Sequence, residues 1–215
     1  MNVSASKENI LKKIRKALSN STPIPFPNSE GNQTIFHPAK QELEIEFAQQ
    51  FTKLQGKFIY CLNTRELGNQ LNTLIQNNQW DKIFCCEEKL SSLLKEELQI
   101  SCPHDNLATC DASITSCECL VARTGTIVLS AGQESGRTVS VYAPIHICIA
   151  YTDQLVYDVK DGLQLLKEKY NNDLPSLISF ATGPSRTADI EKTLVVGVHG
   201  PKEVYVFLVD SKLHG

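Results

Sequence analysis

The sequence predicts an α/β fold built on a single mixed, mostly parallel sheet that is flanked by helices. Between residues 40 and 98, segments with helical periodicity alternate with short apolar runs, which is the pattern of parallel strands covered by helices. From about residue 117 to 157 the apolar runs are closely spaced, which favours hairpins or mixed pairing. A chain of 215 residues that is 41% hydrophobic is long enough for one large domain with a substantial core.

An amphipathic helix is expected before this domain, over residues 4–19. Its apolar residues fall on one stripe, and residues 1–20 carry five basic residues and one acidic residue. Three prolines and a glycine in residues 21–33 then interrupt regular structure. We therefore divide the chain into an N-terminal helix with a Pro-rich linker (1–39) and an α/β domain (40–215). The helix is interpreted as docking on its own domain or on a neighbouring subunit, with binding to nucleic acid or to a membrane surface as alternatives.

The spacing of apolar residues predicts where the helices and strands of the domain lie. Helices are expected where apolar residues recur every three to four positions, at 39–55, 64–78, 88–98 and 158–172. Strands are expected at the short apolar runs, at 56–62, 81–87, 117–122, 125–130, 138–143, 146–151, 154–159, 176–181 and 203–209.

Composition argues against several classes of protein. A net charge of −3 and a pI near 6.0 argue against a nucleic-acid binder. The longest apolar runs fall short of the roughly 20 residues that a membrane span needs. The N-terminus lacks the apolar core of a secretory signal, so a cytoplasmic protein is expected.

The eight cysteines show no CxxC spacing and mostly lie among apolar residues. Buried, reduced thiols are therefore expected. A metal site at Cys110, Cys117 and Cys119 is the alternative. Neither a metal nor an intrinsic cofactor is predicted.

The first candidate cluster is "RTGTIVLSAGQESGR", residues 123–137. Gly125, between Thr124 and Thr126, interrupts a strand pattern and would allow close approach of a ligand or another segment. Arg137, in a polar glycine-containing loop, is suited to hold a carboxylate or phosphate. The alternative is an ordinary hairpin with a solvated arginine.

The second cluster, "ATGPSRTADIE", follows the apolar run at 176–181. Ligands of open α/β sheets bind beyond the carboxyl ends of strands, so a site is expected here. Arg186 would hold an anion, and Asp189 would orient it or act on a proton. The other candidate ligand-binding residues of the cluster are Gly183, Ser185, Thr187 and Glu191. The alternative is a helix start capped by Ser185 or Thr187.

The third cluster is "GVHGPKE", in which His199 stands between Gly197 and Gly200. His199 is suited to general acid or base chemistry, and a structural histidine in a tight turn is the alternative. The sequence has no GxGxxG fingerprint and no GxxxxGK[ST] loop, which disfavours a nucleotide-dependent dehydrogenase acting alone.

Taken together, "TGTIVL", "GPSRTADIE" and "GVHGP" resemble the LUD-domain family of lactate-utilisation proteins, of the LutC/YkgG type. The resemblance covers roughly residues 40–210. It implies a fold like that of ribose-phosphate isomerases and CoA transferases. It also implies an association with oxidation of L-lactate to pyruvate, beside partner subunits that carry iron–sulfur clusters. This chain lacks the cysteine spacing for such clusters, so it resembles the cluster-free subunit.

Within that resemblance, we expect the motifs to converge on one cleft that binds a small anionic ligand. Arg186, Asp189 and His199 are the candidate catalytic residues, by their chemistry. Two alternatives remain open: a non-catalytic assembly or regulatory subunit that docks the iron–sulfur partners, and a stand-alone enzyme of the CoA or sugar-phosphate type. For the latter, Glu118 and Glu134 stay open as acyl-accepting residues.

Overall fold

The computed structural model describes residues 5–19, 39, 41–102, 106–190 and 193–211. It divides into two compact units, residues 1–38 and 39–215. The first unit contains α1 (Ala5–Leu18), a helix at the place that periodicity predicts. Its apolar side chains Ile10, Leu11 and Ile14 are exposed.

The second unit is built on a five-stranded parallel sheet. The strands, in spatial order, are β1 (Lys57–Cys61), β11 (Glu203–Val209), β6 (Ile145–Tyr151), β3 (Ala112–Thr115) and β2 (Ile83–Phe84). Every neighbouring pair is parallel. The sheet brings β1 beside β11, the first and last strands that the structure describes.

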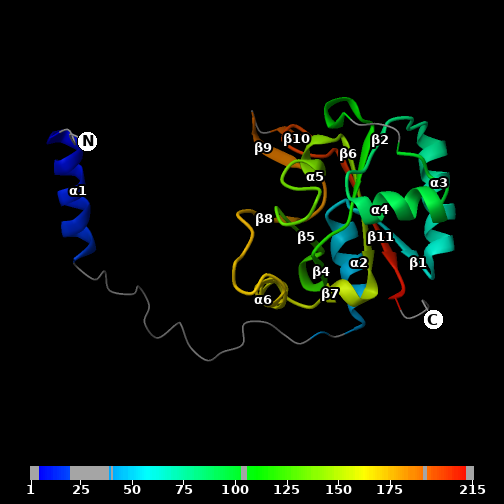
Figure 1. Cartoon of the computed structure of the whole chain (residues 1–215), viewed down its shortest axis with the longest axis horizontal. Coiled ribbons are helices and arrows are strands. Elements are labelled where there is room, and N and C mark those ends of the chain that lie inside the picture. Colours follow the sequence, from blue (N-terminus) through cyan, green and yellow to red (C-terminus); the bar gives the residue numbers. More distant parts are fainter. Residues whose placement is uncertain (1–4, 20–38, 40, 103–105, 191–192, 212–215) are drawn as a thin grey trace. The chain divides into compact units, whose positions relative to one another are not determined.

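Helices cover one face of this sheet, and a helix with a second sheet covers the other (Figure 1). Alternation along β11 shows the division, because Tyr205 and Phe207 pack with α3 (Thr64–Asn78), whereas Val206 packs with α2 (Leu43–Lys53). The first face also receives α4 (Glu88–Ser92) and the π-helical turn Leu93–Glu97 that follows it.

The second sheet is mixed. Its order is β7 (Leu155–Val156), β4 (Cys119–Val121), β5 (Thr126–Ser130) and β8 (Ile178–Ala181). β4–β5 and β5–β8 are antiparallel, and β4–β7 is parallel. The helix α6 (Val159–Lys169) packs Leu166 against this sheet. The remaining elements are the hairpin β9 (Arg186–Ile190) and β10 (Thr193–Val196), the short helix α5 (Val139–Tyr142), and 3₁₀ turns at 107–109, 122–124 and 152–154.

The structure confirms a mixed α/β fold with a mainly parallel sheet flanked by helices, and it distributes the strands over more than one sheet. The predicted strand at 138–143 is wrong, since this segment contains α5. Only Val139 and Ala143 of the segment are buried, a spacing of four residues that one face of a helical turn provides. β3, β9 and β10 were not predicted.

Candidate functional site

The "TGT" motif lies where α2 meets the second sheet. Gly125 has a φ of +60°, and a Cβ at this position would overlap the backbone nitrogen of Phe51, in α2. Only glycine fits such a close approach in the left-handed conformation. The hydroxyl of Thr126 lies 2.7 Å from that of Thr124 and 3.0 Å from that of Thr182. The motif is thereby joined to the segment that follows β8.

The "GPSR" motif packs on the C-terminal end of α2. Gly183 has a φ of +80°, and a Cβ there would lie 2.6 Å from the carbonyl oxygen of Leu54. The guanidinium of Arg186 donates a hydrogen bond to the same carbonyl oxygen. Gly183 and Arg186 therefore both contact the backbone carbonyl of Leu54.

The "GVHGP" motif lies directly against "GPSR". The backbone N–H of Ser185 donates to the carbonyl oxygen of Pro201 at 3.0 Å, and the N–H of Gly197 donates to the carbonyl oxygen of Ser185 at 3.0 Å. Gly200 is in close contact too, because a Cβ there would lie 2.9 Å from the Cβ of Ser185. We call residues 124–126, 183–186 and 197–201 the motif surface. It borders the amino ends of β11 and β6, since Lys202 N–H donates to the carbonyl oxygen of Pro144.

The motif surface carries exposed cationic and titratable side chains. Arg186 and His199 are exposed on it, and Lys202, which directly follows the motif surface, is also exposed and packs its stem across Gly197. Among the side chains that the structure describes, no carboxylate pairs with Arg186. A guanidinium in this setting is suited to bind a carboxylate in bidentate fashion.

Several predicted residues stand apart from this surface. Arg137 donates to the Ser176 hydroxyl at 2.5 Å, at the opposite end of β8 from Thr182. Thr187 and Asp189 lie in β9, where the backbone alone is described, and Glu191 falls outside the described residues.

The helix start considered for "GPSRTADIE" is wrong, because residues 186–190 form a strand. Arg186 and Thr187 pair with Val196 and Val195 of β10. The cross-strand partners supply the backbone hydrogen bonds that a helix would have supplied, so no N-cap is needed at Ser185.

A cavity of about 910 Å³ lies at the other edge of the parallel sheet, beyond the carboxyl ends of β2, β3 and β6. We call it the carboxyl-edge cavity. It is lined by Glu87, Glu88, Lys89, Leu90, Ser92, Leu93, Glu96, Glu97, Ser116, Gly132, Gln133, Glu134, Tyr151 and Lys169. This is the edge at which open α/β sheets bind ligands. Sequence reasoning applied that rule to β8, which belongs to the mixed sheet, and so missed this cavity.

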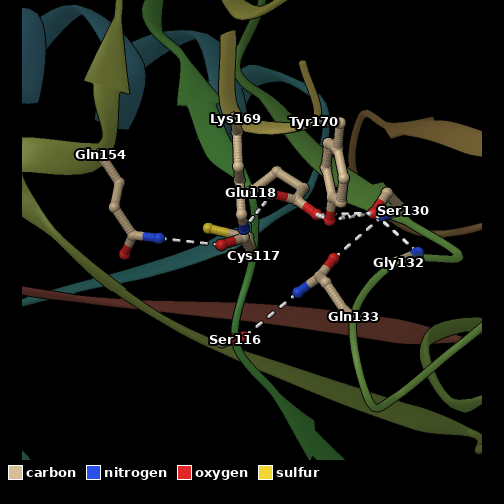
Figure 2. Close-up of polar contacts among 9 residues, drawn as sticks. All are labelled: Ser116, Cys117, Glu118, Ser130, Gly132, Gln133, Gln154, Lys169 and Tyr170. Carbon is tan, nitrogen blue, oxygen red and sulfur yellow. Dashed lines mark hydrogen bonds and ion pairs between the residues drawn. The ribbon is translucent and has the colours of Figure 1, made fainter. Parts of the chain in front are cut away.

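A buried carboxylate network lies beside the cavity (Figure 2), because four of its members, Ser116, Gly132, Gln133 and Lys169, also line the cavity. Glu118 accepts hydrogen bonds from the hydroxyls of Ser130 (2.5 Å) and Tyr170 (2.7 Å) and from the ammonium of Lys169 (2.7 Å). Burial by itself would raise the pKa of Glu118, but the bonds from Lys169, Ser130 and Tyr170 outweigh it and hold the pKa below its ordinary value. Burial lowers the pKa of Lys169 less than Glu118 raises it. Both groups are therefore charged.

The loop after β5 locks this network in place. The N–H of Gly132 donates to the Ser130 hydroxyl at 3.0 Å, and the Gln133 amide links the N–H of Ser130 to the hydroxyl of Ser116. The Glu118 side chain itself has no exposed surface, so it faces neither solvent nor cavity. This burial argues against Glu118 as an acyl-accepting residue. The "SAGQ" end of the first cluster thus belongs to the cavity wall, whereas its "TGT" end belongs to the motif surface.

The family model of the LUD domain matches residues 45–209. The chain belongs to the LUD domain family. Two relatives named lactate utilization protein C align with it almost end to end. The one from Anoxybacillus flavithermus is 28% identical over 94% of this chain and 97% of its own length, and the one from Deinococcus radiodurans is 26% identical over 95% of each chain.

A solved structure shares the fold of this LUD domain. It is described as a DUF162 family protein from Deinococcus radiodurans and aligns with a TM-score of 0.59 at 20% identity, over 80% of this chain and 99% of the other. At that identity the likeness concerns the fold alone.

One buried histidine of the LUD domain has a structural role. His146 is 1% exposed, and burial lowers its pKa to about 4. Its Nε2 lies 2.9 Å from the Thr115 hydroxyl, which already donates its single hydrogen to the carbonyl oxygen of Ser116. Nε2 therefore carries the proton and donates to Thr115.

The cysteines of the LUD domain are all free thiols, and five of the eight are buried: Cys61, Cys110, Cys117, Cys119 and Cys148. Burial raises the pKa of Cys119 to about 12. Within the described ranges, no three His, Cys, Asp or Glu side chains are grouped to hold a metal ion. Of the helices that are described, none has the length and apolar character to cross a bilayer.

Proposed function

We propose that this protein is a component of a lactate utilisation system and that it binds a small carboxylate anion at the motif surface. Two relatives named lactate utilization protein C align over nearly the whole chain, which supports the biological role. The observation that supports the site is the backbone hydrogen bond from Ser185 N–H to the carbonyl oxygen of Pro201. This bond brings Arg186 beside the turn that contains His199.

The roles follow from the chemistry of each group. Arg186 binds the carboxylate through its planar fork, and Lys202 adds positive charge. His199 exchanges a proton with the hydroxyl or keto oxygen of the ligand. Asp189 lies three positions after Arg186 in β9, and residues of a strand alternate between its two faces, so we assign Asp189 no role in orienting Arg186. We assign hydrogen bonding to the ligand, or support of the binding surface, to Thr124, Gly125, Thr126, Gly183, Ser185, Thr187, Glu191 and Gly200.

The overall reaction of such a system removes two electrons and two protons from L-lactate to give pyruvate. We assign both electrons and the proton from C2 to the partner subunits, whose iron–sulfur clusters would carry the electrons. This chain would bind the hydroxy or keto acid and handle a proton at His199.

The test is calorimetric titration and thermal unfolding with L-lactate, pyruvate and, as an anion control, sulfate. A carboxylate at about 100 times its dissociation constant should add about 2.7 kcal/mol to the free energy of unfolding. Arg186→Ala should abolish the effect, while Arg65→Ala, at an exposed arginine of α3, should leave it intact. Equal binding by wild type and Arg186→Ala, or equal binding of sulfate, would contradict the site.

A second candidate is a non-catalytic assembly subunit that docks iron–sulfur partners, and the exposed apolar side chains of α1 favour it. Ile10 and Ile14 are 56% and 48% exposed on a helix with Arg15 and Lys16 in its last turn. Such a face is suited to bind a partner protein. In co-purification from cells, Ile10→Asp with Ile14→Asp should release the partners if assembly is the role. Retained partners together with loss of lactate oxidation in Arg186→Ala would favour the binding function instead.

A further inference from the structure

The carboxyl-edge cavity differs in charge from the motif surface. Its lining contains five glutamates and two lysines. One of the two, Lys169, is already neutralised by Glu118 at 2.7 Å. The free charge around the cavity is therefore negative. A small carboxylate would be repelled here, and a cationic group would be attracted.

Glu87 is the decisive residue of this lining. It is only 8% exposed, and both of its carboxylate oxygens lie 3.1 Å from the same backbone N–H, that of Ser116. Among the described side chains, no cation pairs with it. An ionised carboxylate has room for about four hydrogen bonds, and a buried one without a cation is costly. Glu87 thus has unused capacity to accept hydrogen bonds on the wall of a cavity.

The rest of the lining narrows the chemistry of a ligand. Leu90, Leu93 and Tyr151 offer apolar surface beside Glu87, which suits a methylene stem. Glu134 accepts from the N–H of Glu88 at 2.6 Å and so ties the loop after β5 to the start of α4. A volume of about 910 Å³ is within the range of small-molecule sites.

We propose that the carboxyl-edge cavity is a second ligand site that binds a small molecule with a primary amine or guanidinium on an aliphatic stem. The cationic group pairs with Glu87, and the stem lies along Leu90 and Leu93. The Ser116 hydroxyl oxygen accepts from Gln133 at 3.1 Å and has a second lone pair that can accept a hydrogen bond from the cationic group. This site goes beyond the proposed carboxylate function and is independent of it, since it lies at the opposite edge of the parallel sheet.

The test is calorimetric titration of the full chain with putrescine and agmatine, against 1,4-butanediol as a neutral analogue of putrescine and Mg²⁺ as a metal alone. We expect both amines to bind and the diol not to bind. Glu87→Gln, which removes the charge at nearly constant volume, should weaken amine binding by at least about tenfold. Glu134→Gln, at the exposed rim, should weaken it less and serves as a second variant if Glu87→Gln fails to fold.

Matched controls separate this site from the rest of the molecule. Glu168→Gln, on the exposed face of α6 and outside the cavity lining, should leave amine binding unchanged. Arg186→Ala should also leave it unchanged, so that failure of the carboxylate proposal does not affect this test. The proposal is overturned if neither amine binds, if the diol binds as tightly as putrescine, if Mg²⁺ displaces the amines, or if folded Glu87→Gln binds like the wild type.

Discussion

Two glycines with nearly the same backbone conformation differ sharply in their surroundings. Gly125 has a φ of +60° and touches the backbone of α2, whereas Gly136 has a φ of +62° and would place a Cβ in open space. Gly136→Ala should cost about 1 kcal/mol, for the left-handed conformation alone. Gly125→Ala should cost about 4 kcal/mol or more, because α2 must also move. Urea unfolding of both variants measures the difference, and equal losses would show that the contact between Gly125 and α2 is absent.

His146 should make the protein less stable in acid. Its pKa is about 4 when folded and about 6.5 when unfolded, so between these values the unfolded chain binds more protons. Stability from this residue is complete above pH 6.5 and is lost as the pH falls toward 4, by on the order of 3 kcal/mol. Urea unfolding at several pH values measures the free energy of unfolding as a function of pH. Between pH 6.5 and 4 this free energy should fall less steeply in His146→Gln than in the wild type. An unchanged slope would mean that His146 can be protonated without unfolding.

At the scale of elements, α6 depends on Asp158. Its side chain accepts from the backbone N–H of Lys160 at the N-terminus of α6 and from the guanidinium of Arg123 at 3.0 and 3.2 Å. The far end of α6 presents Lys169 and, next to it, Tyr170 to Glu118. The cap therefore anchors a helix that also completes the cavity wall.

Asp158→Ala should lower the free energy of unfolding by about 2–3 kcal/mol, because it removes both the cap and the ion pair with Arg123. Asp158→Asn keeps a side-chain oxygen for the cap and should therefore lose less unfolding free energy than Asp158→Ala. Denaturant unfolding followed by circular dichroism distinguishes the two variants. If Asp158→Ala left the free energy of unfolding unchanged, neither the cap nor the ion pair would contribute to stability.

The hydrophobic core at the scale of the whole molecule lies within the second unit. Among the described residues, every buried hydrophobic side chain falls between Phe47 and Val209. A chain of residues 39–215 should therefore fold by itself, with a free energy of unfolding within about 1 kcal/mol of the full chain. Denaturant unfolding of the two chains tests this, and loss of a cooperative transition on truncation would refute it.

Local pattern was sufficient for most elements of this protein, and long-range pairing decided the others. The helices α2, α3 and α6 were predictable, because apolar periodicity is a property of adjacent residues. The hairpin β9–β10 was not predictable, because its two strands form only by pairing with each other. The local sequence of this segment also fits the start of a capped helix. α5 was mistaken for a strand, because a segment of four residues is too short to distinguish the 3.6-residue period of a helix from the two-residue period of a strand.

The sequence by itself determined the α/β class, the N-terminal helix and the motifs that carry the family resemblance. Only the tertiary structure decided what those motifs contact. It joined Ser185 to Pro201, fitted Gly125 and Gly183 against α2, and placed the other half of the first cluster at a different edge of the sheet. It also created the cavity beside Glu87, from the ends of β2, β3 and β6, each separated from the next by about 30 residues of chain. The physical reason is that periodicity records which side of an element is buried, whereas a site depends on which elements are packed together.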